Sequence, residues 1–359
     1  TSWNTPMSTQ IESSRSNNIQ LPSVIVELLQ KRGITDIDDF LCWDLKKLPD
    51  LLALKDLSTA SSRIIQAMNN KEKIAVYGDY DVDGTTSCAL LFHFFKLLNI
   101  EIECIQPSRF IEGYGIHPPT IDQAVENDIK VLITVDCGIT NNEAADYAKE
   151  KGVDLIITDH HKDAREEMPN AYAIVNPNRR DEDLESPRTA LAGVGVAFAL
   201  ALQMKNDLAT TGVNSPSIYP LLQFVAIGTI CDMAKLNAMN LKLTRHGLHQ
   251  IPKTTYPGIK SFFPPEERAI GHVPSDKISF TVGPMINSKG RLEHPKKALE
   301  LLTCDDISVA FECFSMLEIA NKERKSIQHQ VFEEAKKQVI ESNQTDQIIN
   351  IVYEPNWHE

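Results

Sequence analysis

The sequence lacks several patterns that mark common classes of protein. It has seven cysteines but no C-x-x-C pair, which argues against a zinc ribbon and is typical of reduced thiols in a cytoplasmic protein. No G-x-G-x-x-G motif follows a predicted strand, so an ordinary dinucleotide-binding Rossmann domain is not expected. The longest apolar stretch, residues 190–202, is too short to span a bilayer. Neither a signal peptide nor a membrane partner is predicted.

The chain also lacks an excess of positive charge. Its 359 residues include 36 lysines and arginines against 49 aspartates and glutamates, a net charge of −13. Proteins that hold long duplexes through their phosphates are usually basic, so tight binding to duplex DNA is not expected. Bound cations and a local basic groove can still attract phosphate, because total charge does not describe how charges are distributed.

Three aspartates occupy alternate positions directly after an apolar run at residues 74–77. They are Asp79, Asp81 and Asp83. If the strand continues briefly through them, its period of two directs all three carboxylates to one side, where they ionise together only beside cations. This pattern predicts a site for divalent metal. A calcium loop would need a glutamate six residues after Gly84, and Leu90 stands there instead.

Two further strand-like runs end in residues that suit a metal site. Residues 131–135 lead into Asp136, and residues 154–158 lead into the sequence Asp-His-His at positions 159–161. Short β-branched runs followed by helical stretches predict buried parallel strands of βαβ units, whose ligands gather at the carboxyl ends of the strands. A solvated surface turn is the alternative for either cluster. Independent turns would have no reason to share this placement.

Asp232 is a fourth candidate. It ends the apolar stretch at residues 225–231, which is expected to be buried. An aspartate at the end of such a stretch is either a helix cap or a metal ligand. This segment alone leaves both readings open.

The ordered set of motifs resembles the DHH phosphoesterase superfamily, and within it the RecJ single-strand exonuclease branch. The segments that carry the resemblance are DYDVDG (79–84), VDCG (135–138), DHH (159–161), GTICD (228–232), Arg109 with EGYG (112–115), LAGVGVAF (191–198), PMIN (284–287) and GRL (290–292). They extend over nearly the whole chain. A single D-x-D or H-H pair would be weak evidence, whereas this many motifs in order are specific.

The resemblance implies an α/β fold, mainly a parallel sheet with flanking helices, that binds two divalent ions, Mn²⁺ or Mg²⁺. The implied metal ligands are Asp79, Asp81, Asp83, Asp136, His160 and Asp232. Asp136 would bridge the ions and Asp81 would bind one of them, with Asp79 directly coordinated or just outside. The other three ligands would hold the second ion. Two ions about 3.5 to 4 Å apart can clamp a phosphodiester and neutralise the charge that builds on its leaving oxygen.

The resemblance also implies roles beyond metal binding. His161 would contact the phosphate, and Asp159 would orient an imidazole. Substrate-binding residues would be Arg109, Asn287 and Arg291, whose two guanidinium groups suit a terminal phosphate. Surface salt bridges are the alternative for these arginines.

One position departs from the family pattern. Many relatives carry a histidine metal ligand four residues before Asp81, and this chain has Tyr77 there. The resemblance then implies either that Asp79 compensates or that the first ion binds more loosely.

The chain divides into segments by composition and periodicity. We expect an extended arm (1–20), a helical N-terminal cap (21–70), a DHH catalytic domain (71–308) with a loop at 287–291, a long C-terminal connecting helix (309–342), and a strand at 348–352 within the truncated start of a DHHA1-type domain (343–359). A coiled-coil partner helix is the alternative for 309–342, but no heptad is sustained there.

The function that the resemblance implies is 5′→3′ exonuclease action on single-stranded DNA, which releases 5′-mononucleotides in repair and recombination. A nanoRNase or pAp phosphatase of the same superfamily and a non-catalytic replication scaffold are the alternatives. The implied partners are single-stranded DNA, a single-strand binding protein and a helicase. The chain is expected to be monomeric and cytoplasmic.

Overall fold

The computed structural model describes residues 21–48, 50–107, 113–162, 167–213, 216–292 and 296–357, without the side chains of residues 289–292. Within these ranges one five-stranded sheet has the order β2-β1-β3-β4-β5, and every pairing in it is parallel. The strands are β1 (Lys73–Gly78), β2 (Glu103–Ile105), β3 (Ile129–Val135), β4 (Asp154–Thr158) and β5 (Ala173–Val175).

Helices make up most of the remaining structure. They are α1 (Ser23–Lys31), α2 (Ile37–Leu41), α3 (Leu57–Asn70), α4 (Val82–Leu97), α5 (Pro118–Glu126), α6 (Asn142–Glu150), α7 (Gly193–Thr210), α8 (Leu222–Cys231), α9 (Ala238–Gln250), α10 (Pro257–Phe262), α11 (Pro265–Ala269), α12 (Ser275–Lys277), α13 (Gly283–Leu292), α14 (Lys296–Thr303) and α15 (Ile307–Glu341). Shorter helical turns are η1 (Leu45–Lys47), η2 (Pro187–Ala190), η3 (Tyr219–Leu221), η4 (Ile251–Lys253) and the π-helical η5 (Ile278–Val282).

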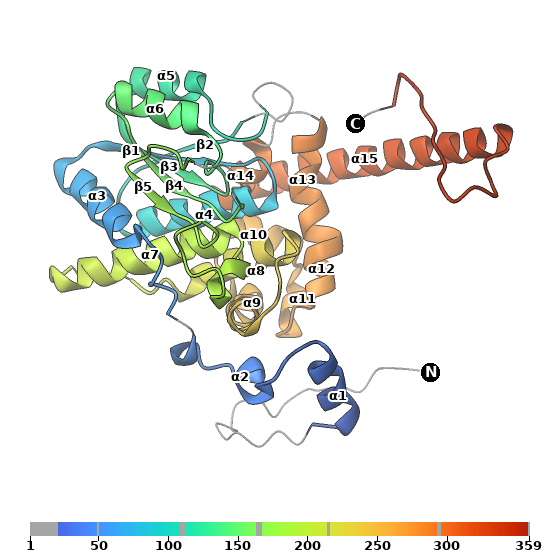
Figure 1. Ribbon diagram of the computed structural model, residues 1–359, viewed down its shortest axis with the longest axis horizontal. Coiled ribbons are helices and arrows are strands. Elements are labelled where there is room, and N and C mark those ends of the chain that lie inside the picture. Colours follow the sequence, from blue (N-terminus) through green and yellow to red (C-terminus); the bar gives the residue numbers. More distant parts are fainter. Residues whose placement is uncertain are drawn as a thin grey trace.

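Alternate side chains of the strands enter two separate apolar layers. From β1, Ile74 and Val76 join the layer that includes α4 and α7, whereas Ala75 and Tyr77 join the layer that includes α5 and α6. Figure 1 shows α5 and α6 above the sheet and α4 and α7 below it. Burial on both faces explains why the strands read as continuous apolar runs. The predicted α/β fold with a mainly parallel sheet is confirmed.

The first acidic motif does not extend the strand as the sequence pattern suggested. Strand β1 ends at Gly78, and Asp81 caps helix α4 by accepting a hydrogen bond from the Gly84 amide at 3.0 Å. Asp83 therefore lies in the first helical turn rather than on a strand. The helix cap is favoured over a longer strand because an aspartate before a helix accepts a hydrogen bond from an amide that would otherwise lack a partner. The three carboxylates are brought together by a strand-to-helix turn, not by strand alternation.

Two other expectations about local structure are wrong. Residues 287–291, expected as a loop, belong to helix α13, where the Ser288 hydroxyl bonds the carbonyl oxygens of Met285 at 2.6 Å and of Leu317 in α15 at 3.2 Å. Residues 348–352, expected as a strand, form none in the described structure. An apolar run becomes a strand only where another strand can pair with it.

The long helix expected near the end of the chain is present as α15. Asp306 caps it by accepting hydrogen bonds from the amides of Ser308 and Val309 at 2.6 and 3.3 Å. Its buried residues all come from the first half, between Ala310 and Asn321. The second half extends away from the rest of the molecule (Figure 1).

No helix in the described ranges is long and apolar enough to cross a membrane.

Helix α2 is joined to α9 through a buried charge. The Lys242 side chain on α9 is fully buried, and its ammonium group contacts Asp39 of α2 at 2.8 Å. Burying an ammonium group is costly unless a partner offsets the lost hydration. This ion pair therefore fixes α2 against the body of the protein.

We predict that Asp39→Asn lowers the free energy of unfolding by about 1–3 kcal/mol, because it leaves the buried ammonium without a counter-charge. Asp38→Asn is the matched control, since Asp38 is exposed and also lies in the first turn of α2. Urea unfolding of both variants measures the difference. Equal midpoints would show that the ion pair does not stabilise the fold.

Candidate metal centre

Three carboxylates directly follow three neighbouring strands. They are Asp79 after β1, Asp136 after β3 and Asp159 after β4. Each continues the hydrogen-bond ladder of the sheet by one residue, with amide-to-carbonyl distances of 3.3 Å from Asp79 to Val135, 3.0 Å from Asp136 to Thr158 and 3.1 Å from Asp159 to Val175. The sheet backbone therefore sets where these side chains begin. Asp136 has a φ of 61°, a left-handed conformation that persists in non-glycine residues mainly where surrounding structure enforces it.

The predicted metal ligands come together at this edge of the sheet. Three groups have ligand atoms within 4.8 Å of one another: Asp79, Asp81 and Asp136; Asp83, His160 and Asp232; and Asp136, His160 and His161. All six predicted ligands are included, and Asp136 belongs to two of the groups. Asp232 ends α8, where its backbone amide bonds the Gly228 carbonyl at 2.8 Å, and its carboxylate belongs to one of the groups, which favours the ligand reading of that side chain.

Several atoms in these groups are buried and face one another without hydrogen bonds. Asp79 Oδ1, Asp136 Oδ1 and His160 Nε2 have no hydrogen-bond partner among the described residues. His160 Nε2 nevertheless lies 3.1 Å from Asp136 Oδ1 and 3.8 Å from Asp83 Oδ2. The short contact lacks hydrogen-bond geometry, so these lone pairs converge on a common space. Buried polar atoms without partners are costly, and a cation in that space would satisfy them.

Backbone amides hold Asp83 in place. Its two carboxylate oxygens accept hydrogen bonds from the amides of Gly193 at 2.6 Å and Val194 at 3.0 Å, in the first turn of α7. The N-terminus of a helix carries unsatisfied amides and a partial positive charge, both of which favour an anion. Asp83 therefore joins α4 to α7 and keeps lone pairs for a metal.

Two glycines let helices approach the carboxylates. A Cβ on Gly193 would lie 2.7 Å from the Asp136 Cβ and 2.8 Å from its Oδ1. A Cβ on Gly228 in α8 would lie 2.7 Å from Asp83 Oδ1. Real Cβ atoms do not approach this closely, so only glycine fits at either position.

The electrostatics of the cluster favour added positive charge. Burial, followed by the charge of Asp81, raises the pKa of Asp79 to about 7. The same two causes, in the same order, raise the pKa of Asp232 to about 6. Burial and then a neighbouring aspartate raise the pKa values of Asp83 and Asp136 well above the ordinary range. Carboxylates packed together out of water resist ionisation until a cation compensates them.

The two adjacent histidines differ in their surroundings. Burial, followed by the charge of His161, lowers the pKa of His160 to about 4, so its imidazole is neutral and able to bind metal. His161 Nδ1 lies 2.7 Å from Asp159 Oδ1, and this hydrogen bond raises the pKa of His161. Burial alone would raise the pKa of Asp159, but bonds from His161 and from the Ile139 amide keep it low.

Of the predicted substrate-binding residues, only Asn287 has a side chain within the described part of the structure. Arg109 and the side chain of Arg291 lie outside the described residues. Asn287 is half-buried in α13. Tyr114 also lies at the cluster although the sequence predicts no separate role for it, and its hydroxyl oxygen is 3.0 Å from His161 Nδ1. The feature of the sequence that could have drawn attention to Tyr114 is the pair of glycines that flank it, Gly113 and Gly115.

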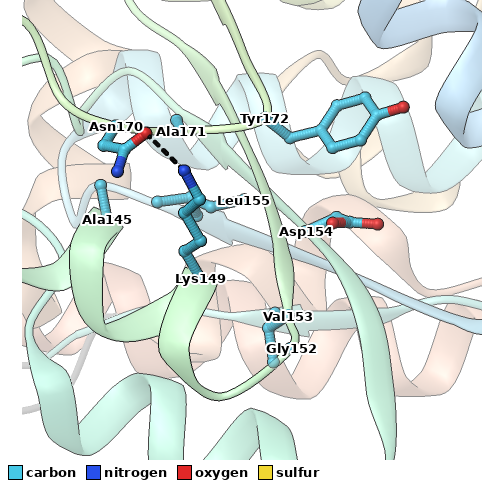
Figure 2. A pocket seen from close by; sticks show the side chains of 9 residues that line it. All are labelled: Ala145, Lys149, Gly152, Val153, Asp154, Leu155, Asn170, Ala171 and Tyr172. Carbon is cyan, nitrogen blue, oxygen red and sulfur yellow. Dashed lines mark hydrogen bonds between the residues drawn. The ribbon is translucent and has the colours of Figure 1, made fainter.

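A cavity of about 240 Å³ lies elsewhere, at the opposite edge of the sheet. Figure 2 shows it between the start of β4 and the segment that leads into β5, with the Lys149 ammonium bonded to Asn170 Oδ1 at 3.1 Å. Its lining includes the amino end of β4, whereas the metal cluster lies beyond the carboxyl ends. The two sites are therefore distinct.

Comparison with known proteins agrees with this geometry. The model of the DHH family, N-terminal domain, matches residues 73–229, which include the strand ends described above. The fold and the carboxylate–histidine cluster thus define a DHH-type protein.

The similar proteins of known name belong to one branch of that family. The chain is 33% identical over 350 residues to the single-stranded-DNA-specific exonuclease RecJ of Dickeya dadantii, covering 94% of this chain and 60% of that protein. It is 32% identical to the Bacillus subtilis RecJ, covering 96% of this chain and 43% of that protein. A crystal structure of exonuclease RecJ bound to manganese has a TM-score of 0.72 at 30% identity, covering 81% of this chain and 71% of that one. The chain belongs to the DHH family, in its RecJ branch.

We predict that Gly193→Ala weakens Mn²⁺ binding at least about tenfold and destabilises the fold by about 1–3 kcal/mol, because the added methyl displaces Asp136 or α7. Gly195→Ala, two residues along the same helix, is the control, since its Cβ would chiefly meet the tip of the Leu191 side chain, at 2.9 Å. Isothermal titration calorimetry measures both affinities. Equal affinities in the two variants would mean that the close approach does not shape the centre.

The raised pKa values also predict how metal stabilises the protein. A carboxyl whose pKa is higher in the folded state binds more protons there than in the unfolded chain, so its contribution to stability falls as pH rises through that range. For Asp79 the range runs from about 4 to about 7. Metal replaces those protons, so Mn²⁺ should raise the melting temperature more at pH 8 than at pH 5.5. Differential scanning fluorimetry tests this, and equal shifts at both pH values would contradict it.

Proposed function

We propose that this protein hydrolyses phosphodiester bonds of single-stranded DNA with two divalent ions, Mn²⁺ or Mg²⁺. The observation that carries the proposal is the pair of donor groups beyond the sheet, one of Asp79, Asp81 and Asp136 and one of Asp83, His160 and Asp232. Three of their buried atoms, Asp79 Oδ1, Asp136 Oδ1 and His160 Nε2, lack hydrogen-bond partners in the described structure. Carboxylate oxygens with one imidazole suit Mg²⁺ and Mn²⁺ rather than soft metals.

Each side chain then has a role. Asp136, buried beside both groups, would be the ligand shared by the ions. The first group would hold one ion through oxygen atoms alone, with Asp79 in the place of the histidine that many relatives carry at position 77. His160 would supply the second ion with its nitrogen ligand. Bound there, the ions would polarise the phosphodiester and lower the pKa of an attacking water.

His161 would act on the phosphate rather than on the metals. Its Nδ1 is engaged by Asp159 at 2.7 Å, so Nε2 would be the ring nitrogen that faces the substrate. Asp159 is fully buried and accepts three further hydrogen bonds, from the amides of Ile139, His160 and His161. It would therefore fix the imidazole without itself touching the substrate.

The substrate class follows from the relatives named above. Both RecJ proteins are called single-stranded-DNA-specific exonucleases, and the chain spans 60% or less of each of them. We extend that activity to this chain as 5′→3′ removal of mononucleotides in repair and recombination. Arg109, Asn287 and Arg291 would bind the strand. A single-strand binding protein and a helicase would be its protein partners, and the enzyme would act as a monomer in the cytoplasm.

We predict that the protein releases mononucleotides from 5′-labelled single-stranded DNA only when Mn²⁺ or Mg²⁺ is present. Asp136→Asn should reduce the rate at least about a hundredfold and weaken metal binding, because it removes the negative charge and one of the two oxygens of the shared ligand. His161→Ala should lose turnover by a similar factor yet keep most metal affinity. Gel assays and Mn²⁺ calorimetry separate these effects.

Asp122→Asn is the control for these variants, because its carboxylate lies on α5 and bonds the Tyr147 hydroxyl at 2.8 Å. Normal turnover in Asp136→Asn would overturn the metal assignment. A loss of Mn²⁺ affinity in His161→Ala as large as in His160→Ala would show that the histidine roles are exchanged.

A further inference from the structure

Tyr114 lies beside the metal centre and has no role in the reaction proposed above. Its ring meets the His161 imidazole edge-on, with centroids 5.6 Å apart and an interplanar angle of 73°. Its hydroxyl oxygen is 3.0 Å from His161 Nδ1. The residue is 40% exposed, so it borders the cluster and remains accessible from solvent.

The hydrogen bonds of His161 determine what the Tyr114 hydroxyl can do. Nδ1 carries at most one proton, and Asp159 Oδ1 lies 2.7 Å from it. An ionised carboxylate only accepts, so Nδ1 must donate to Asp159 and has no lone pair for a second donor. The Tyr114 oxygen can approach Nδ1 only as a further acceptor of the same N–H. Its own O–H proton is therefore left to donate to another group.

The backbone around Tyr114 is fixed by its neighbours. Gly113 and Gly115 have φ values of 80° and 88°, which glycine adopts without strain. A Cβ on Gly115 would lie 2.6 Å from Asn141 Oδ1. The Tyr77 hydroxyl, reaching from β1, donates to the Gly115 carbonyl at 2.8 Å. The backbone on the carboxyl side of Tyr114 is thus anchored to β1 and to Asn141.

Position 77 holds a tyrosine in this chain. Tyr77 is buried on the face of the sheet that packs against α5 and α6. Its hydroxyl donates a hydrogen bond to the segment that carries Tyr114. The side chain at this position therefore acts on the placement of Tyr114.

We infer that the Tyr114 hydroxyl donates a hydrogen bond to a phosphate oxygen of the bound phosphodiester, next to His161, and that Tyr77 positions it. This inference rests on the proposed function, because it assumes that the phosphate binds at this metal centre. A neutral donor aimed at an oxygen where negative charge builds lowers the barrier without placing another cation beside the metals.

The test compares Tyr114→Phe, Tyr77→Phe and Tyr172→Phe in the Mn²⁺-loaded protein. Tyr172 is a suitable control because it is 47% exposed and lines the distant cavity of Figure 2. The substrate is the p-nitrophenyl ester of thymidine 5′-monophosphate, and calorimetry with thymidine 5′-monophosphate measures phosphate binding without turnover. Mn²⁺ affinity and melting temperature are measured in parallel.

Tyr114→Phe should reduce kcat roughly tenfold to a hundredfold and weaken monophosphate binding in the same direction, as expected for a lost hydrogen bond to a charged group. Its Mn²⁺ affinity and melting temperature should match wild type. Tyr77→Phe should give a smaller loss of kcat, because it removes the hydrogen bond to the Gly115 carbonyl but leaves the Tyr114 hydroxyl in place. Tyr172→Phe should behave as wild type.

Unchanged kcat and monophosphate affinity in Tyr114→Phe would overturn the inference. So would a matching loss of Mn²⁺ affinity, which would make Tyr114 a structural support of the centre. The proposed function fails separately, if the wild type binds the monophosphate but does not degrade single-stranded DNA. In that case the effect of Tyr114→Phe on monophosphate affinity still decides the inference.

Discussion

The spacing between neighbouring parallel strands is the constraint on which the metal centre depends. Parallel strands lie about 4.8 Å apart, and β1, β3 and β4 are adjacent in the sheet. Asp79, Asp136 and Asp159 follow these strands directly, with their amides still bonded to the next strand. Two metal ions that share a ligand are separated by about 3.5 to 4 Å, a distance close to that strand spacing. The spacing of the strands therefore sets the distance between the carboxylates to a value that suits two metal ions.

Gathering so many carboxylates at one edge opposes folding, and the surrounding structure offsets that cost locally. Amides at the start of α7 bond Asp83, and the Gly84 amide bonds Asp81. Glycines at 193 and 228 admit helices at distances that any other residue would block. What remains uncompensated is a set of buried oxygen and nitrogen atoms that face one another. The polypeptide provides the donor atoms and holds them in place, and a cation would supply the positive charge that they need.

Much of this arrangement could be read from the sequence. Runs of β-branched residues predicted β3 and β4, and the polar residues after them predicted an edge where ligands meet, because parallel strands place their carboxyl ends together. Helix α15 followed from a long charged stretch without proline or glycine. The clustering of the six ligands was predicted from family motifs, whereas hydropathy alone left Asp232 open.

Other features could not be read locally. The turn from β1 into α4 depends on Asp81 acting as a cap, and an alternating acidic pattern fits a strand equally well. The helix at 287–291 depends on packing against α15, and the absent strand at 348–352 depends on pairing partners far away in sequence. The contact between Tyr114 and His161 joins residues 47 positions apart, and no periodicity predicts such a contact.

Asp83 illustrates how chemistry and architecture come to share one residue. Its oxygens bond the first amides of α7, and it belongs to a group of side chains that could hold a metal ion. A change there would disturb the start of an 18-residue helix as well as the proposed reaction. Over evolutionary time, a lineage that no longer needed the reaction would still face selection on this aspartate for folding. Preservation of Asp83 in a distant homologue would therefore be weak evidence of activity, whereas a change at His161, whose side chain bonds Asp159 and does not hold the start of a helix, would be more telling.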